Sequence, residues 1–196
     1  VLSVSKQLTL PLLTWTSAID IAPAREAAKD EPDWSRSLGL WRIDGAAKIA
    51  AEIIKEFEGY SSKPYLCPAN VATIGYGNTR YLNGERVNMD DKDITKGEAE
   101  KMLMDTIKFV EKEVKNVVEV KLPVHKLAAL ISFTYNVGIG NLSNSTLLAW
   151  VNSNPDYSQI PSQFRRWNRG GGKVLKGLIR RREAEIELWV GTSQYV

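Results

Sequence analysis

The sequence predicts an α+β fold, in which a small antiparallel sheet follows one helix and precedes a larger group of helices. Apolar residues recur at helical spacing from 46 to 57. The segment 60–87 is instead rich in aromatic, Thr and Gly residues with turn signals, and helical spacing returns from residue 95 onward. One helix, a few strands and then several helices are typical of the α+β class rather than of an alternating α/β chain.

The composition is that of a folded globular chain. The 196 residues are 43% hydrophobic and 25% charged, with a formal net charge of +3, so we expect a packed core. The single cysteine, Cys67, excludes an intramolecular disulfide, and with only one histidine, His125, we expect neither a metal nor a cofactor. No apolar run approaches the roughly eighteen residues of a membrane span. The sequence starts at Val1 without Met, which is compatible with removal of an initiator, signal or anchor segment.

Residues 1–43 differ from the rest of the chain. They contain three of the six tryptophans, Trp15, Trp34 and Trp41, and the stretch 22–37 is polar and interrupted by proline. This pattern predicts a linker or an arm, and the tryptophans favour an arm that packs on the main domain or on a partner. We therefore expect an N-terminal arm or linker with a regulatory role over 1–43, followed by one domain over 44–196.

The first helix is expected to begin after Asp44, a suitable N-cap residue, and to end at Glu58 and Gly59. Two or three short strands should follow, and Asn83-Gly84 between two short runs is a hairpin signal. A capping box of Thr95 and Glu98 then begins a long helix. The apolar face of this helix comprises Ala99, Leu103, Ile107, Val110, Val114 and Val117. Further helices are predicted over the segments 127–134, 145–151, 162–167 and 181–190.

The segment Arg165–Arg182 contains eight Lys or Arg residues and no Asp or Glu. Such a run fits either a solvated helix face or a surface that binds an anionic partner. It lacks the interleaved aromatic residues that stack on bases, so we expect no nucleic-acid partner. An anionic cell wall or membrane surface is the expected partner of this segment.

Three residues with suitable chemistry follow one another closely. Glu58 ends the first predicted helix, and Cys67 and Thr73 lie in the predicted sheet, which can fold all three around one cleft. Glycoside hydrolysis needs an acid that protonates the leaving oxygen and a second group that attacks the sugar or activates water. Glu58 suits the first task, Cys67 the second as a thiolate, and Thr73 can position water. The same pattern also fits a surface Glu, a buried Cys and a strand Thr without catalytic tasks.

The segment EGYSSKPYLCPANVATIGYGNT resembles the catalytic segment of the phage T4-type lysozymes, or endolysins, of glycoside hydrolase family 24, which have a Glu, an Asp or Cys and a Thr at this spacing. Four later blocks match the family in the same order, so that the resemblance covers residues 45–192. These blocks are ALISFTYNVGIGNLSNSTLL, FRRW, GGGKVLKGL and RRREAEIELW. The resemblance implies a lysozyme-like fold, with a sheet lobe, a larger helical lobe and an active-site cleft between them, and makes 44–196 the catalytic domain.

The resemblance also implies a function and its residues. It implies a muramidase that hydrolyses the β-1,4 bond between N-acetylmuramic acid and N-acetylglucosamine in peptidoglycan and so lyses the host cell. Glu58 would be the general acid, Cys67 would occupy the position that Asp holds more often, and Thr73 would lie beside the attacking water. Such a protein would be made in the host cytoplasm and act in the periplasm. The implied substrate-binding residues are Gly77, Thr79, Tyr135, Asn136 and Ser145.

Cys67 departs from the commoner family pattern. A thiol with an ordinary pKa of about 8.5 is mostly protonated at neutral pH, whereas a carboxylate is ionised. The cysteine form is similar to a branch that includes signal-arrest-release endolysins. As a nucleophile the thiolate would form a covalent thioglycoside, and as a base it would activate water, so that retention and inversion of configuration both stay open.

Two other functions fit parts of the sequence. A non-catalytic peptidoglycan-binding module would explain the loss of Asp, but Glu58 and Thr73 are intact. A cysteine peptidase would pair Cys67 with His125, but Cys67 precedes Pro68 instead of opening a helix.

Overall fold

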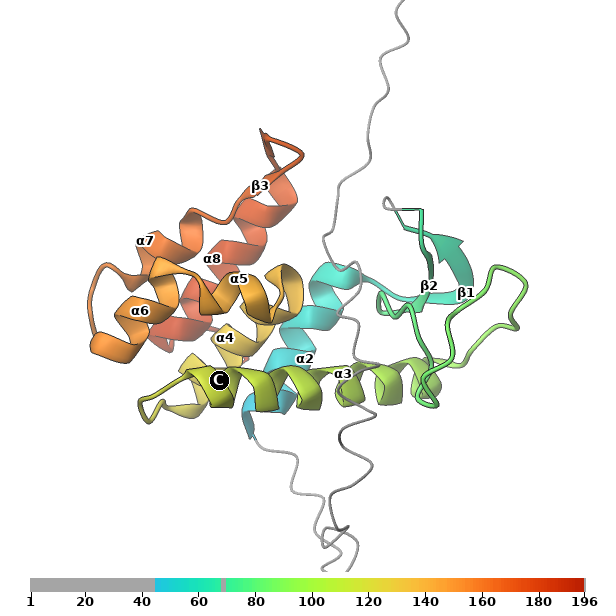
Figure 1. Ribbon diagram of the computed structural model, residues 1–196, viewed down its shortest axis with the longest axis horizontal. Coiled ribbons are helices and arrows are strands. Elements are labelled where there is room, and N and C mark those ends of the chain that lie inside the picture. The colour runs from blue at the N-terminus through green and yellow to red at the C-terminus, as the bar shows by residue number, and fades with distance from the viewer. Residues whose placement is uncertain (1–44, 68–69, 196) are drawn as a thin grey trace, which may run out of the picture.

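A computed structural model of the protein describes residues 45–67 and 70–195 (Figure 1). The α+β class is confirmed, because a small sheet lobe follows the first described helix and a larger helical lobe completes the chain. The predicted arm over 1–43 and the predicted N-cap Asp44 lie outside the described residues. The elements in chain order are α2 (Gly45–Glu58), β1 (Ser61–Leu66), β2 (Ala72–Gly75), α3 (Lys96–Val117), α4 (Val124–Val137), α5 (Ile139–Ser143), α6 (Thr146–Ser153), α7 (Ile160–Arg165), β3 (Arg169–Gly170), β4 (Lys173–Val174) and α8 (Lys176–Val190).

Helix α3 connects the two lobes. It runs beneath the sheet at its N-terminal end and beneath the helical lobe at its C-terminal end (Figure 1). The predicted capping box begins it: the Glu98 backbone N–H donates to Thr95 Oγ1 at 3.2 Å, and the Thr95 N–H donates to the Glu98 carboxylate at 2.7 Å. The predicted apolar face is buried from Ala99 to Val114, and only Val117 is half-buried.

The sheet lobe is small, and residues outside its two strands help to stabilise it. Strands β1 and β2 are antiparallel, with Tyr65 opposite Thr73 and a shift of register between Ser61 and Tyr65. Because a two-stranded sheet is marginal in water, its links to the segment before α3 matter. The Ile94 N–H donates to the Ser62 carbonyl at 2.9 Å, and the Tyr60 hydroxyl donates to the Ile94 carbonyl at 2.9 Å.

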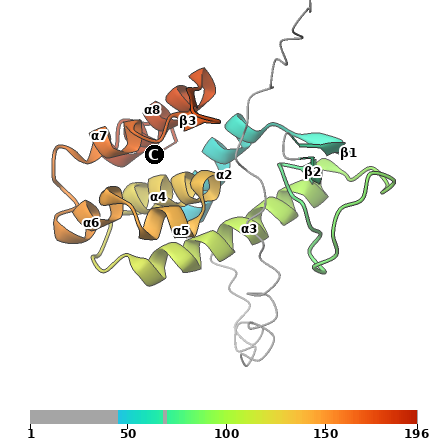
Figure 2. The same ribbon diagram turned by 45° about the horizontal axis from the view of Figure 1, so that its top comes forward.

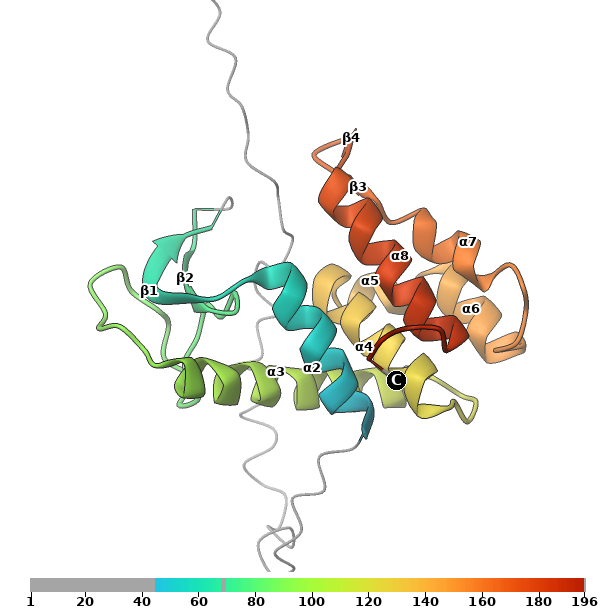
Figure 3. The ribbon, with the colours of Figure 1, turned by 180° about the vertical axis from the view of Figure 1, so that it is seen from behind.

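Helix α4 is the centre of the helical lobe. All nine residues from Ala128 to Asn136 are buried, and α4 packs most extensively against α2 and α8. Figure 2 shows the tiers, with α8 above α4 and α3 below it. From behind, α2 crosses α3 (Figure 3). No helix in the described ranges is long and apolar enough to cross a membrane.

Several local predictions were incomplete. The hairpin predicted at Asn83-Gly84 is reduced to one isolated bridge between Arg80 and Arg86, because the flanking segments are short and polar. Helix α5 was missed because it has five residues and too few positions for a periodic pattern. The β3–β4 hairpin was missed because each strand has two residues; Gly171 and Gly172 turn between them with φ of 56° and 77°. Helix α8 begins five residues before the predicted start, which brings Lys176 and Arg180 onto it.

Candidate active site

Glu58 is the last residue of α2, where that helix meets the sheet lobe. The apolar face of α2 is buried and Gly59, with φ of 70°, ends the helix, so the position of the carboxylate is fixed from both sides. Only 2% of the Glu58 side chain is exposed. A buried carboxylate needs a partner, and here the partner comes from the far end of the chain.

That partner is Arg181, in α8. Its Nη1 donates to Glu58 Oε1 at 2.5 Å, its Nη2 donates to the Ser132 carbonyl of α4 at 3.3 Å, and its side chain is 3% exposed. Burial acts to lower the pKa of Arg181, but the carboxylates of Glu58 and Glu185 outweigh burial and raise it. Arg181 therefore stays cationic and joins three helices.

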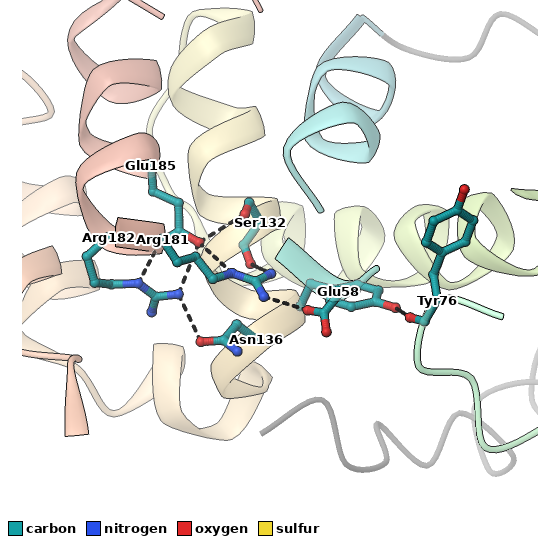
Figure 4. A network of polar contacts seen from close by, with 8 residues as sticks. Glu58, Tyr76, Ser132, Asn136, Arg181, Arg182 and Glu185 are labelled. Atoms are coloured by element: carbon teal, nitrogen blue, oxygen red, sulfur yellow. Dashed lines mark hydrogen bonds and ion pairs between the residues drawn. The ribbon is translucent and has the colours of Figure 1, made fainter. Parts of the chain in front are cut away.

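A second arginine and a second carboxylate extend this network into the helical lobe (Figure 4). Glu185 Oε1 accepts from Arg181 Nε at 3.3 Å, from Arg182 Nη2 at 3.1 Å and from Ser132 Oγ at 2.9 Å. Arg182 Nη2 also donates to Asn136 Oδ1 at 2.9 Å. Burial lowers the pKa of Arg182 to about 10, although Glu185 opposes this shift. Both arginines are thus charged at neutral pH inside the protein.

Cys67 and Thr73 belong to the sheet lobe: Thr73 lies on β2, and Cys67 follows the end of β1. Thr73 stands opposite Tyr65, so their side chains share one face of the sheet. Cys67 follows directly after β1, and its backbone N–H donates to the Val71 carbonyl at 3.0 Å. Burial raises the pKa of Tyr65, and the negative charge of Glu58 and then of Cys67 adds to this shift. Glu58 and Cys67 both act electrostatically on Tyr65, while the grouping of Glu58, Cys67 and Thr73 around one cleft stays a prediction. Thr73 is 2% exposed and donates its hydroxyl to the Val71 carbonyl at 2.9 Å.

A pocket of about 250 Å³ lies in the helical lobe beside this network. Asn136 forms part of its wall, and the Asn136 Nδ2 is buried without a hydrogen-bond partner among the described residues. Arg182 fixes the Asn136 oxygen, and the buried Nδ2 is left as an unused donor. The other lining residues are Val137, Asn141, Trp167, Arg169, Gly170, Gly171 and Leu178.

The remaining predicted substrate-binding residues have structural partners. The Tyr135 hydroxyl donates to the Tyr76 carbonyl at 3.1 Å and so links α4 to the sheet lobe. Ser145 caps α6 by accepting from the Leu148 N–H at 3.0 Å. Gly77 has φ of 89° and the Thr79 carbonyl accepts from the Val87 N–H at 3.0 Å. Sugar contacts by these four residues stay predictions.

Sequence reasoning missed the residues that hold Glu58. Arg181 and Arg182 were assigned to a basic surface over Arg165–Arg182, and for these two residues that prediction is wrong, because they are 2% and 0% exposed. The available signal was the spacing of Glu185 from both arginines, three and four residues along one helix. No group of three or more His, Cys, Asp or Glu that could hold a metal occurs within 45–67 and 70–195.

Comparisons with known proteins agree with this architecture. Residues 55–185 match the phage lysozyme family. The chain is 36% identical over 153 residues to an endolysin of Bacillus phage B103, covering 76% of this chain but only 56% of that protein. It is 37% identical to a SAR-endolysin of bacteriophage PS119, covering 74% of this chain and 88% of that one. The muramidase domain of SpmX from Asticaccaulis excentricus has the same fold, with 28% identity, a TM-score of 0.62 and coverage of 72% of this chain and 94% of that chain.

Replacement of Arg181 by Met tests how much the buried ion pair of Arg181 and Glu58 contributes to the stability of the fold. The Arg181→Met variant leaves Glu58 buried without a counter-ion, and we expect the free energy of unfolding to fall by about 3–5 kcal/mol. Arg165→Met is the matched control, because Arg165 also pairs with a carboxylate of α8, Glu183, but both side chains are about half exposed. That control should lose less than about 1 kcal/mol. Urea denaturation measures both, and equal losses would contradict the assignment.

Proposed function

Because the chain belongs to the phage lysozyme family and is a glycoside hydrolase, we propose that it is an endolysin-type muramidase. The bond cleaved is the β-1,4 bond between N-acetylmuramic acid and N-acetylglucosamine in peptidoglycan. The observation that carries this proposal is the buried carboxyl of Glu58, held by Arg181 at the end of α2, where the chain enters the sheet lobe. Glycoside hydrolysis requires such a buried carboxyl together with a second nucleophilic or basic group, a role that we assign to Cys67.

In this mechanism Glu58 donates its proton to the leaving glycosidic oxygen. Cys67 either attacks the anomeric carbon as a thiolate or removes a proton from the attacking water, and Thr73 positions that water through its hydroxyl oxygen. The unused Nδ2 donor of Asn136 binds an acceptor oxygen of the substrate in the adjoining pocket. The protein is made in the host cytoplasm and acts on periplasmic peptidoglycan.

The Glu58→Gln variant tests the proposal. Without the acid, release of new reducing ends from purified sacculi should fall by about a hundredfold to ten-thousandfold. Glu56→Gln is the control, because Glu56 is an exposed residue of the same helix, and it should retain activity. Equal, negligible release by the wild-type protein and by Glu58→Gln would refute catalysis and favour a binding module, while new amino termini would identify a peptidase.

Cys67 is tested by two substitutions in the same assay. If the thiolate replaces the carboxylate that other members carry, Cys67→Asp should retain activity and Cys67→Ser should abolish it, because a serine hydroxyl does not ionise near neutral pH. Both side chains are of similar size to cysteine, so thermal unfolding should change little. Full activity of Cys67→Ser would show that the proposed role is wrong.

We further propose that the exposed part of the basic segment binds an anionic wall or membrane surface. Arg165 pairs with Glu183, and Arg181 and Arg182 are buried, so the exposed basic residues left for this task are Arg166, Arg169, Lys173, Lys176 and Arg180. They lie at the end of α7, on the β3–β4 hairpin and on the first part of α8, and Arg169 lines the pocket.

Reversal of two of these charges tests the surface. The double variant Lys173→Glu/Lys176→Glu should bind sacculi or anionic vesicles roughly tenfold more weakly at low salt, and the difference should vanish as salt screens the charges. Lys92→Glu/Lys96→Glu, which changes two exposed lysines near the sheet lobe, makes the same change of net charge. Equal weakening by both variants in a sedimentation assay would exclude a specific surface.

A further inference from the structure

Glu185 is a fully buried carboxylate that the proposed reaction does not use. It receives hydrogen bonds from Ser132 and from both arginines, and its Oε2 lies 2.9 Å from Arg182 Nε, an ion pair that is not aligned as a hydrogen bond. The buried network therefore contains two guanidinium groups and two carboxylates (Figure 4). Of the two carboxylates, Glu58 alone lies at the sheet lobe.

The ion pair of Arg181 and Glu58 conflicts with the chemistry expected of Glu58. A general acid must carry a proton before it can donate one, whereas a guanidinium in direct contact favours the ionised carboxylate. Arg181 does not give its whole charge to Glu58, because its Nε is bonded to Glu185. This inference rests on the proposed role of Glu58 as the acid. We propose that Glu185 is a positioning residue: its carboxylate offsets part of the positive charge of Arg181, and Glu58 can therefore hold a proton.

The two tyrosines that face Glu58 carry no charge that would replace this effect. Tyr135 comes from α4 and Tyr65 from β1, and burial followed by the charge of Glu58 raises the pKa of both phenols, which keeps them neutral. Cys67 is the other titratable group that acts on Tyr65, and its thiolate would add a negative charge on the side of the sheet lobe. On the side of the helical lobe the charges come from α8: Arg181 contacts Glu58, and Glu185 and Arg182 interact with Arg181 or Glu58 in turn.

The Glu185→Gln variant tests the proposal through the pH dependence of the reaction. The variant keeps the shape of the side chain and removes its charge, so Arg181 acts on Glu58 alone. Glu58 then loses its proton at lower pH, and the alkaline limb of kcat/KM should move about one pH unit toward acid. Titration of the Glu58 carboxyl carbon by carbon-13 NMR, with the signal assigned from Glu58→Gln, should give the same shift without any substrate.

A second variant should move the limb in the opposite direction. Arg182→Met preserves much of the packing of Arg182 over the Phe133 ring, whose centre lies 4.9 Å from the guanidinium carbon. With Arg182 replaced, Arg181 is the one arginine among the described residues that still pairs with Glu185. Glu58 should then keep its proton to higher pH. Glu183→Gln, two residues before Glu185 on α8 but partly exposed, makes the same change of charge as Glu185→Gln and should leave the limb in place.

The outcomes separate this inference from the proposed function. Shifts of opposite sign in Glu185→Gln and Arg182→Met support it. Shifts of the same sign, or none in folded variants, overturn it and reduce Glu185 to a packing residue. If Glu185→Gln fails to fold by circular dichroism, the direction of the shift in Arg182→Met decides. If the wild-type protein releases no reducing ends, the proposed function fails, and the NMR midpoints still decide whether Glu185 controls the proton of Glu58.

Discussion

The contact between Arg181 and Glu58 is the constraint on which the rest of the structure depends. A buried charge without a partner costs several kcal/mol, so α8 must place its guanidinium at the end of α2. The same guanidinium bonds the Ser132 carbonyl of α4. One side chain thus fixes three helices relative to each other, at the position where the helical lobe meets the sheet.

Much of the fold followed from local pattern. The end of α2 at Glu58, the capping box of α3 and the apolar run of α4 depend on helical spacing and on a few terminal residues, and such signals act within one or two turns. Short elements were missed for the same reason. A helix of five residues and strands of two residues offer too few positions for any periodicity to be visible.

The site was predictable only in part. Glu58, Cys67 and Thr73 lie within sixteen consecutive residues, so a motif and a fold-back argument could propose them as one group. The partner of Glu58 lies 123 residues away, and the partners Ser132 and Glu185 are 53 residues apart. The run of eight basic residues does not by itself show which two are buried, because their burial depends on Glu185, three and four residues further along α8, and on Glu58, which the fold brings in from α2. The resemblance marked the block that contains these arginines without giving their task.

The unbroken burial of α4 has a consequence for how such an enzyme can diversify. Ser132, Tyr135 and Asn136 belong to a helix with no solvent-facing side between Ala128 and Asn136, so any change there disturbs the core as well as the site. The β3–β4 hairpin lines the pocket of about 250 Å³ that Asn136 also lines, but the hairpin is largely exposed. Substitutions on the hairpin side of the pocket should therefore be tolerated more readily than substitutions in α4, which also disturb the core.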